Sequence, residues 1–336
     1  NTGAVNPSYL YFGQATYNNA IAVAPGTTNT VVMCGSLCSK SIDGGTTWAS
    51  PTMSGGSYHV DVHDLQYDAA GTLYFATDGG IYSSPDSGNN SVSRNTGLVT
   101  AQFYKITIDR SNVDRVMGGL QDNGTWRRFT AASTTWDSLI SSDGQGCQLS
   151  SSNPSLGWAS NQAYSGGNYL WQTKNIAGPA SPPPLFVLMS PIFPGTESLP
   201  FDTQVETDPQ RPSVLYTNTN RLWRSMTGGD AFAPLPTTTT DASTWNSYII
   251  DSIAIAPTDY QTIMVAKGPD VYRSSDGGST WTRRDTGLPG YWVNTLTIDP
   301  FDANTAYAGL ATTSGTSVYY TSNGGASWTA HSSGLP

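Results

Sequence analysis

The stretch SDGGSTW at residues 275–281 decides the fold, because the chain repeats it. The same pattern returns as SIDGGTTW at residues 41–48 and as SNGGASW at residues 322–328, where asparagine replaces the aspartate. Two more divergent copies lie at residues 84–88 and 225–232. A short motif that recurs along a chain indicates a repeated supersecondary unit, so a repeat architecture is the first hypothesis.

Each copy has the composition of a tight hairpin turn. An aspartate or asparagine side chain can fold back onto nearby backbone N–H groups, and the Gly-Gly pair supplies positive φ angles that other residues avoid. The closing tryptophan is expected to tuck under the next strand. We therefore interpret these positions as structural parts of turns; they are Asp43, Trp48, Asp276, Trp281, Asn323 and Trp328.

Short strands of alternating polarity flank the turns. Residues 252–257, 262–266 and 271–274 form one such series, and residues 296–320 repeat it. One series per turn indicates a four-stranded blade. Candidate first strands begin near Ile21, His59, Phe103, Gln148, Val214, Ile253 and Leu296.

The sequence thus predicts an all-β fold, a single β-propeller over residues 1–336 with about seven four-stranded blades. The Pro-rich segment 177–200 is interpreted as an insertion or a long blade connection. The terminal residues 333–336 resemble residues 286–289, which precede a later repeat, so the sequence allows a natural protein that extends beyond residue 336.

Composition narrows the classes of partner. The 336-residue chain carries a net charge of −9, and its 15 Lys and Arg residues are scattered, which argues against a nucleic-acid partner. No apolar run approaches the roughly 18–20 residues of a transmembrane helix. Cys34 and Cys38 bracket a short turn, where a disulfide or two buried thiols are alternative readings, and Cys147 has no evident partner.

The turns and strands resemble the Asp-box (BNR-repeat) β-propeller superfamily, which includes sialidases, sortilin-like receptors and xyloglucan hydrolases. The chain is most similar to secreted bacterial sortilin-like or glycosyl-hydrolase-like repeat proteins, through residues 17–48, 59–64, 77–83, 102–104 and 119–125. This resemblance implies an Asp-box propeller that is secreted or lies at the cell surface and binds a glycan or a surface protein.

A sialidase activity is not indicated. Sialidases of this superfamily bind the carboxylate of sialic acid with three arginines spread over several blades, whereas no arginine precedes Arg94 in this chain. Arg110, Arg115, Arg127 and Arg128 fall within one predicted blade.

The most unusual stretch is His59-Val60-Asp61-Val62-His63-Asp64, which holds two of the three histidines. In a strand, His59, Asp61 and His63 would share one face. Three readings stay open: a divalent metal held by His59, Asp61 and His63; catalysis by Asp61 or Asp64 as acid or base; and a hydrogen-bonded polar strand without chemistry.

A second polar cluster suits either sugar hydroxyls or hydrogen bonds between blades. Its members are Gln102, Tyr104, Gln121, Asp122 and Asn123, and together with His59 and His63 they are the candidate ligand-binding residues. The Gly-flanked Asp78 and Asp143 make a loop-bound Ca²⁺ an alternative, although no cofactor is required. Tryptophans outside the turns could stack on sugars or lie between blades; they are Trp158, Trp171, Trp223, Trp245 and Trp292.

Two functions of different class follow. The first is a non-catalytic propeller that binds glycans or a surface partner. The alternative is a glycoside hydrolase that acts through paired aspartates, as the resemblance to xyloglucan hydrolases implies. Two carboxylates facing one bond, about 5–10 Å apart in an open cleft, would favour hydrolysis, whereas paired or buried aspartates favour binding.

Overall fold

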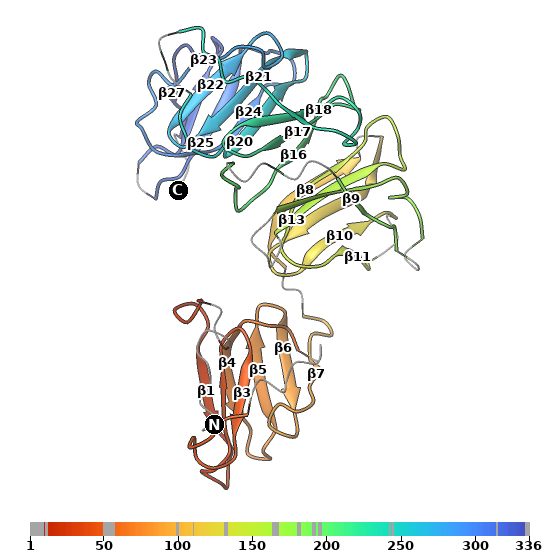
Figure 1. Ribbon diagram of the computed structural model, residues 1–336, viewed down its shortest axis with the longest axis vertical. Coiled ribbons are helices and arrows are strands. Elements are labelled where there is room, and N and C mark those ends of the chain that lie inside the picture. Colours follow the sequence, from red (N-terminus) through yellow and green to blue (C-terminus); the bar gives the residue numbers. More distant parts are fainter. Residues whose placement is uncertain are drawn as a thin grey trace. The chain divides into compact units, whose positions relative to one another are not determined.

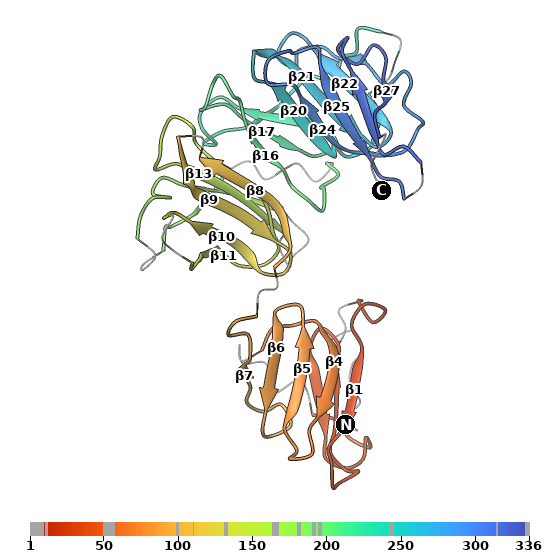
Figure 2. The same cartoon turned by 180° about the vertical axis from the view of Figure 1, so that it is seen from behind.

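The computed structural model describes residues 10, 13–49, 58–98, 101–109, 111–130, 134–162, 168–179, 183–189, 193, 197–241, 243, 245–313 and 315–332. The chain forms two compact units, Asn1–Ala101 and Gln102–Pro336 (Figures 1 and 2). The single ring over residues 1–336 stays a prediction. Within these ranges, no helix is long and apolar enough to cross a membrane.

The N-terminal unit contains two antiparallel sheets. The first comprises β1 (Ala20–Val23), β2 (Val31–Cys34) and β3 (Cys38–Ser41), and the second comprises β4 (Val62–Tyr67), β5 (Leu73–Thr77), β6 (Gly80–Ser84) and β7 (Val92–Ser93). Ala49 forms an isolated bridge to Lys40 beside β3. A hydrophobic cluster joins the two sheets through Val32 and Phe75. Of the two readings for Cys34 and Cys38, the structure shows the disulfide, which closes the β2–β3 turn.

The C-terminal unit contains five four-stranded sheets, in each of which the strands follow one another in chain order. The first sheet comprises β8 (Phe103–Asp109), β9 (Asn112–Leu120), β10 (Gly124–Arg128) and β11 (Asp137–Ile140), and the second comprises β12 (Gly144–Leu149), β13 (Gly157–Gln162), β14 (Asn168–Thr173) and β15 (Val187–Leu188). The third comprises β16 (Val205–Thr207), β17 (Leu215–Asn218), β18 (Leu222–Ser225) and β19 (Ala233–Pro234), and the fourth comprises β20 (Ser252–Ala256), β21 (Asp259–Lys267), β22 (Asp270–Ser274) and β23 (Thr282–Arg283). The fifth comprises β24 (Val293–Ile298), β25 (Ala306–Leu310), β26 (Val318–Thr321) and β27 (Thr329–Ala330).

The packing of these sheets is that of propeller blades. Each antiparallel meander is one blade, and the hydrophobic clusters lie between blades that follow one another in the chain. Ala254 and Met264 of one sheet pack with Leu296 of the next, for example. The described residues therefore contain seven blade-type sheets, six with four strands and one with three, and the prediction of an all-β fold with about seven blades is confirmed.

Three predicted strand positions differ from the structure. The fourth first strand, β12, begins at Gly144, four residues before Gln148, and the fifth is β16, because Val214 lies just before the second strand, β17. The segment 177–200 is more than a connection, since β15 within it is the outer strand of its sheet.

Five turns with one hydrogen-bond pattern join third strands to the chain that follows. In each, the hydroxyl oxygen of the last residue of the third strand accepts a hydrogen bond from the backbone N–H four residues later, at 2.7–3.0 Å. The side chain two residues after this hydroxyl residue then accepts hydrogen bonds from the end of the turn. In the fourth turn, for example, Asp276 accepts from Thr280 N and Oγ1 at 2.9 and 2.6 Å. The hydroxyl residues are Ser41, Ser84, Ser225, Ser274 and Thr321.

These hydrogen bonds affect acid stability. Those from Thr47 and Ser41 lower the pKa of Asp43 to about 2. Because the folded-state pKa lies below that of an unfolded aspartate, the contribution of this turn is complete above about pH 4 and is lost as the pH falls toward 2.

The tryptophans of the turns differ in their surroundings. Trp281 and Trp328 are buried between sheets, and their indole N–H groups donate to Pro236 O at 3.0 Å and Arg284 O at 2.7 Å. Trp48 is only half-buried and donates to Gly45 O within its own turn. The two buried tryptophans thus anchor their turns, but they do so on a preceding loop and not under the next strand.

We expect Asp276→Ala to lower the free energy of unfolding by about 1–2 kcal/mol, because Thr280 and Ser274 lose their acceptor. Denaturant titration measures the change. Asp230→Ala is the control, since Asp230 is exposed and makes only a 3.9 Å ion pair with Lys174. Equal effects of the two substitutions would contradict a structural role for the turn.

Candidate functional site

A groove of about 460 Å³ lies on the C-terminal unit, where the loops before β16, β20 and β24 meet. Three aromatic side chains line it: Phe201, Tyr248 and Trp292 are 55, 45 and 46% exposed. Asp202, Asp251, Ser198 and Ser247 add polar groups. We name the site formed by these seven residues the aromatic groove.

Gly268, at the turn between β21 and β22, connects three parts of the aromatic groove. Its N–H donates to Asp251 Oδ2 at 2.8 Å, and its carbonyl accepts from Val293 N, next to Trp292, at 2.8 Å. The Tyr248 ring lies against its α-carbon, so that a β-carbon there would come within 2.9 Å of the ring. Its φ of +61° is also one that side-chain-bearing residues rarely adopt. Glycine is therefore required here on two grounds.

Tyr248 is fixed from both sides. Its ring packs edge-on against Trp292, with centroids 5.3 Å apart, and its backbone carbonyl accepts a hydrogen bond from the Lys267 ammonium. Lys267 is completely buried, also donates to Asn220 O at 2.7 Å and lies 4.7 Å from the Trp245 ring. Burial lowers the pKa of Lys267 to about 7, although Asp251, Glu197 and Asp270 oppose that shift.

Phe201 is held by its backbone. The buried Gln145 of β12 donates from its side-chain amide to Phe201 O and accepts from Thr203 N at 3.1 Å. The neighbouring Gly146 lets the two chains approach, because a β-carbon at this position would lie 2.7 Å from Thr203 O. Tyr104 packs edge-on against the Phe201 ring, with centroids 6.0 Å apart.

Both carboxyl groups of the aromatic groove hold their protons more tightly than usual. Burial raises the pKa of Asp202, and Lys105 opposes this shift. Burial likewise raises the pKa of Asp251, against the hydrogen bond from Gly268 and the charge of Lys267. Within the described part of the chain, the buried Oδ1 atom of Asp202 has no hydrogen-bond partner. An acid in this state is suited to donate or share a proton with a ligand.

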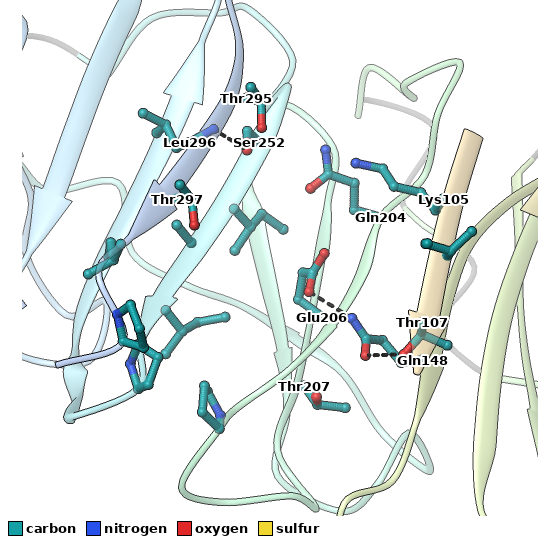
Figure 3. A pocket seen from close by; sticks show the side chains of 18 of the residues that line it. Lys105, Thr107, Gln148, Gln204, Glu206, Thr207, Ser252, Thr295, Leu296 and Thr297 are labelled. Atoms are coloured by element: carbon teal, nitrogen blue, oxygen red, sulfur yellow. Dashed lines mark hydrogen bonds between the residues drawn. The ribbon is translucent and has the colours of Figure 1, made fainter. Parts of the chain in front are cut away.

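The first strands of the five sheets surround a second space, a cavity of about 890 Å³ (Figure 3). Gln204, Ser252 and Thr295 line this cavity, and each follows a residue of the aromatic groove along the same stretch of chain. The groove therefore lies at the end of the unit where β16, β20 and β24 begin. We name this space the central cavity.

Glu206 is the most perturbed acid of the central cavity. Its Oε2 accepts from Gln148 Nε2 at 2.8 Å, and Thr107 Oγ1 donates to the other end of that amide at 3.4 Å. Burial raises the pKa of Glu206 to about 7, although Lys105 and Gln148 oppose it. Figure 3 shows the Lys105 side chain extending from β8 toward Gln204, and Glu206 beside Gln148.

The stretch 59–64 does not form one strand. β4 begins at Val62, and Asp61 before it has a φ of +60°, so His59, Asp61 and His63 do not alternate on one face as predicted. A register irregularity between Val62 and Asp64 displaces His63 further. The alternating pattern could not reveal this, because an isolated positive φ leaves no periodic signal.

The N-terminal unit nevertheless brings several of these side chains together. Asp61 Oδ1 accepts from Asn18 Nδ2 at 2.5 Å, and burial raises its pKa despite a hydrogen bond from Ser36. His63 Nε2 lies 2.6 Å from Asp78 Oδ1, to which Tyr17 also donates at 3.3 Å. These contacts pair both carboxylates with protein groups.

The remaining residues of this stretch have local roles. His59 Nδ1 lies 3.0 Å from Val60 O, and its side chain covers Gly79. The exposed Asp64 accepts from Leu65 N at 2.9 Å. A metal on His59, Asp61 and His63 and catalysis by Asp61 or Asp64 both stay predictions.

The second predicted cluster is partly a turn. Gln121 N donates to Gln102 O at 2.9 Å, Asn123 Nδ2 to Gln121 O at 3.0 Å, and Asp122 N to Asp143 Oδ1 at 2.8 Å. These contacts organise the β9–β10 connection and the start of β12. Among the residues of this cluster, Tyr104 is the one whose ring reaches the aromatic groove, through Phe201. Ligand binding by the cluster stays a prediction.

The sequence analysis named Trp292 as one of five candidate stacking tryptophans, without distinguishing it from the others, and missed its neighbours in the groove. Trp158 and Trp223 are buried between sheets, whereas Trp292 is 46% exposed. Phe201, Tyr248, Asp202 and Asp251 carried no motif. One compositional signal was available for the central cavity: Glu206 is one of only two glutamates in the chain.

Comparisons with known proteins give fold-level likenesses only. No sequence family and no curated protein matches the chain. Solved structures that resemble it include a GH74 xyloglucanase from Xanthomonas campestris, with 15% identity over 97% of this chain and 62% of that one, at a TM-score of 0.42. YCF48 from Cyanidioschyzon merolae has 12% identity over 86% of this chain and 91% of that one, at 0.43.

A third likeness is the Cps50 (Swd1) β-propeller domain from Myceliophteria thermophila, with 10% identity over 91% of this chain and 96% of that one, at a TM-score of 0.47. The chain spans less than two thirds of the length of the Xanthomonas xyloglucanase. The fold is that of a β-propeller, with seven blade-type sheets in the described residues.

We expect Gly268→Ala to lower the free energy of unfolding by about 2–4 kcal/mol, because backbone strain adds to the clash with Tyr248. Gly315→Ala is the matched control: its φ of +82° imposes similar strain, but nothing lies within 4 Å of the added carbon. Denaturant titration of both variants isolates the clash. Equal destabilisation would show that the ring does not rest on Gly268.

Proposed function

We propose that this protein is a glycan-binding propeller, secreted or displayed at the cell surface, and that the glycan lies in the aromatic groove. The observation that carries the proposal is the exposure of Phe201, Tyr248 and Trp292 in one groove of about 460 Å³. Three large aromatic side chains that are half exposed at one place indicate a binding surface.

The chemistry of the aromatic groove matches that of a sugar chain. A pyranose has C–H-rich faces that pack on aromatic rings and equatorial hydroxyls that need hydrogen-bond partners. Tyr248 and Trp292 stand at 61° to each other, so they offer two differently oriented faces. Asp202, Asp251 and the two serines supply acceptors and donors beside them.

The supports around the groove favour a preformed site. Lys267 fixes the backbone of Tyr248, Gln145 fixes that of Phe201, and Gly268 joins Asp251 to the chain beside Trp292. Residues positioned in this way lose little conformational freedom when a ligand binds, which raises affinity for a given set of contacts.

We expect Trp292→Ala to weaken binding to the best polysaccharide of a plant and bacterial panel by at least about tenfold, because a stacking face is lost. Affinity electrophoresis screens the panel, and calorimetry measures the affinity. Tyr291→Ala is the control, since Tyr291 is also 46% exposed but does not line the groove. Equal losses in both variants, or no binding to any polysaccharide, would count against a glycan site and favour a protein ligand.

A second candidate, glycoside hydrolysis, has one specific observation in its favour. Asp202 and Asp251 line the same groove, and burial raises the pKa of both. A glycosidase needs one carboxylic acid that keeps its proton near neutral pH and a second carboxylate facing the same bond. The hypothesis of catalysis by Asp61 or Asp64 requires the same pair of carboxyl groups in the N-terminal unit.

Release of new reducing ends from the bound polysaccharide distinguishes these alternatives. For a binding protein we expect no product. Product that disappears in Asp202→Asn and Asp251→Asn, but not in Asp61→Asn or Asp64→Asn, would replace the binding proposal with hydrolysis in the aromatic groove. The reverse pattern would place the chemistry in the N-terminal unit.

A further inference from the structure

The central cavity holds two ionisable side chains that are not paired with each other. Of the described residues that line it, Lys105 and Glu206 are the ionisable ones. They interact electrostatically, yet no ion pair within 4.0 Å joins them in the described part of the chain. The cavity volume of about 890 Å³ falls within the usual range of small-molecule sites, roughly 300–1,000 Å³.

Lys105 has unused binding capacity. Its ammonium makes no hydrogen bond or ion pair with any described residue, although it extends toward Gln204 in the cavity (Figure 3). Glu206 uses Oε2 to accept from Gln148, which leaves Oε1 available. A ligand group that accepts from both Lys105 and a protonated Glu206 would satisfy both side chains at once.

The rest of the lining is hydroxyl and amide groups alternating with aliphatic ones. Five first strands contribute, and the uncharged polar lining residues are Thr107, Gln148, Ser151, Gln204, Thr207, Ser252, Thr295 and Thr297. Hydroxyls and amides match a polyhydroxylated ligand because each can both donate and accept hydrogen bonds.

We propose that the central cavity is a second binding site, which takes a small polyhydroxylated carboxylate of the uronic-acid type, with its carboxylate between Lys105 and Glu206 and its hydroxyls against the threonine, serine and glutamine side chains. This site is separate from the aromatic groove, and the inference does not rest on the proposed function. A carboxylate at Lys105 gains charge-assisted hydrogen bonds in a partly enclosed space, where they are stronger than in water.

The proposed site has a defined pH dependence. Glu206 must be protonated to donate to the ligand carboxylate, and its pKa is about 7 because of burial. The charged groups that act on it are Lys105 of β8 and Asp202 before β16, and Glu206 in turn raises the pKa of the buried Cys147 thiol of β12. Among the lining residues described on β20 and β24, none is titratable. Binding is therefore strong below pH 7 and is lost as the pH rises through 7.

Calorimetric titration of the full chain with glucuronate, against glucose as the uncharged probe, tests the proposal. We expect glucuronate to bind at least about tenfold more tightly than glucose at about pH 6, and its affinity to fall about tenfold by pH 8, as the protonated fraction of Glu206 falls from about 0.9 to 0.1. Lys105→Met should remove the preference for glucuronate, whereas Lys174→Met, a change at an exposed lysine that does not line the cavity, should leave it.

Glu206→Gln keeps a donor at every pH, so glucuronate binding should persist but become independent of pH. Thermal unfolding of each variant confirms that it folds, and Trp292→Ala should leave glucuronate affinity unchanged, which separates this site from the aromatic groove. Equal affinities for glucuronate and glucose, or an unchanged pH dependence in Glu206→Gln, would overturn the proposal.

Discussion

The packing of one sheet against the next is the constraint on which the rest of the structure depends. A four-stranded antiparallel meander cannot bury both of its faces by itself, so each core cluster is shared by two sheets that follow one another in the chain. In the C-terminal unit this places five first strands around one cavity. Both candidate sites are consequences, because the lining of the cavity and the loops that form the groove belong to those same strands.

The turns and the sites rely on the same physical device, a backbone held by a side chain from another segment. Asp276 organises a turn whose tryptophan then reaches Pro236 in a distant loop. Gln145 and Lys267 act similarly on the chain that carries Phe201 and Tyr248. A buried lysine is costly to keep in its charged form, and Lys267 is held by its hydrogen bond to the carbonyl of the exposed Tyr248.

The fold was predictable from the sequence because its signals are local. The two sites were not predictable, because their residues come from segments far apart in the chain. Turns with aspartate, glycine and tryptophan and strands that alternate can be found within windows of ten residues. They located the sheets, although the strand starts near His59, Gln148 and Val214 and the segment 177–200 were not placed correctly. The alternation at 59–64 failed because Asp61 adopts a positive φ that the residue type does not disclose. The aromatic groove combines residues about 45 positions apart, and only the stacking of sheets brings them together.

One stretch of chain shows why the two sites differ in chemistry. Asp202, Gln204 and Glu206 project toward the groove and cavity at alternate positions, while Thr203 and Val205 between them are buried in the sheet packing. Asp202 lines the groove together with exposed aromatic rings, where a ligand would be held by stacking. Glu206 lines the cavity together with Lys105, where charge would dominate. The positive charge of Lys105 opposes the raised pKa of both Asp202 and Glu206. An anion bound at Lys105 would therefore weaken this effect at Asp202 as well.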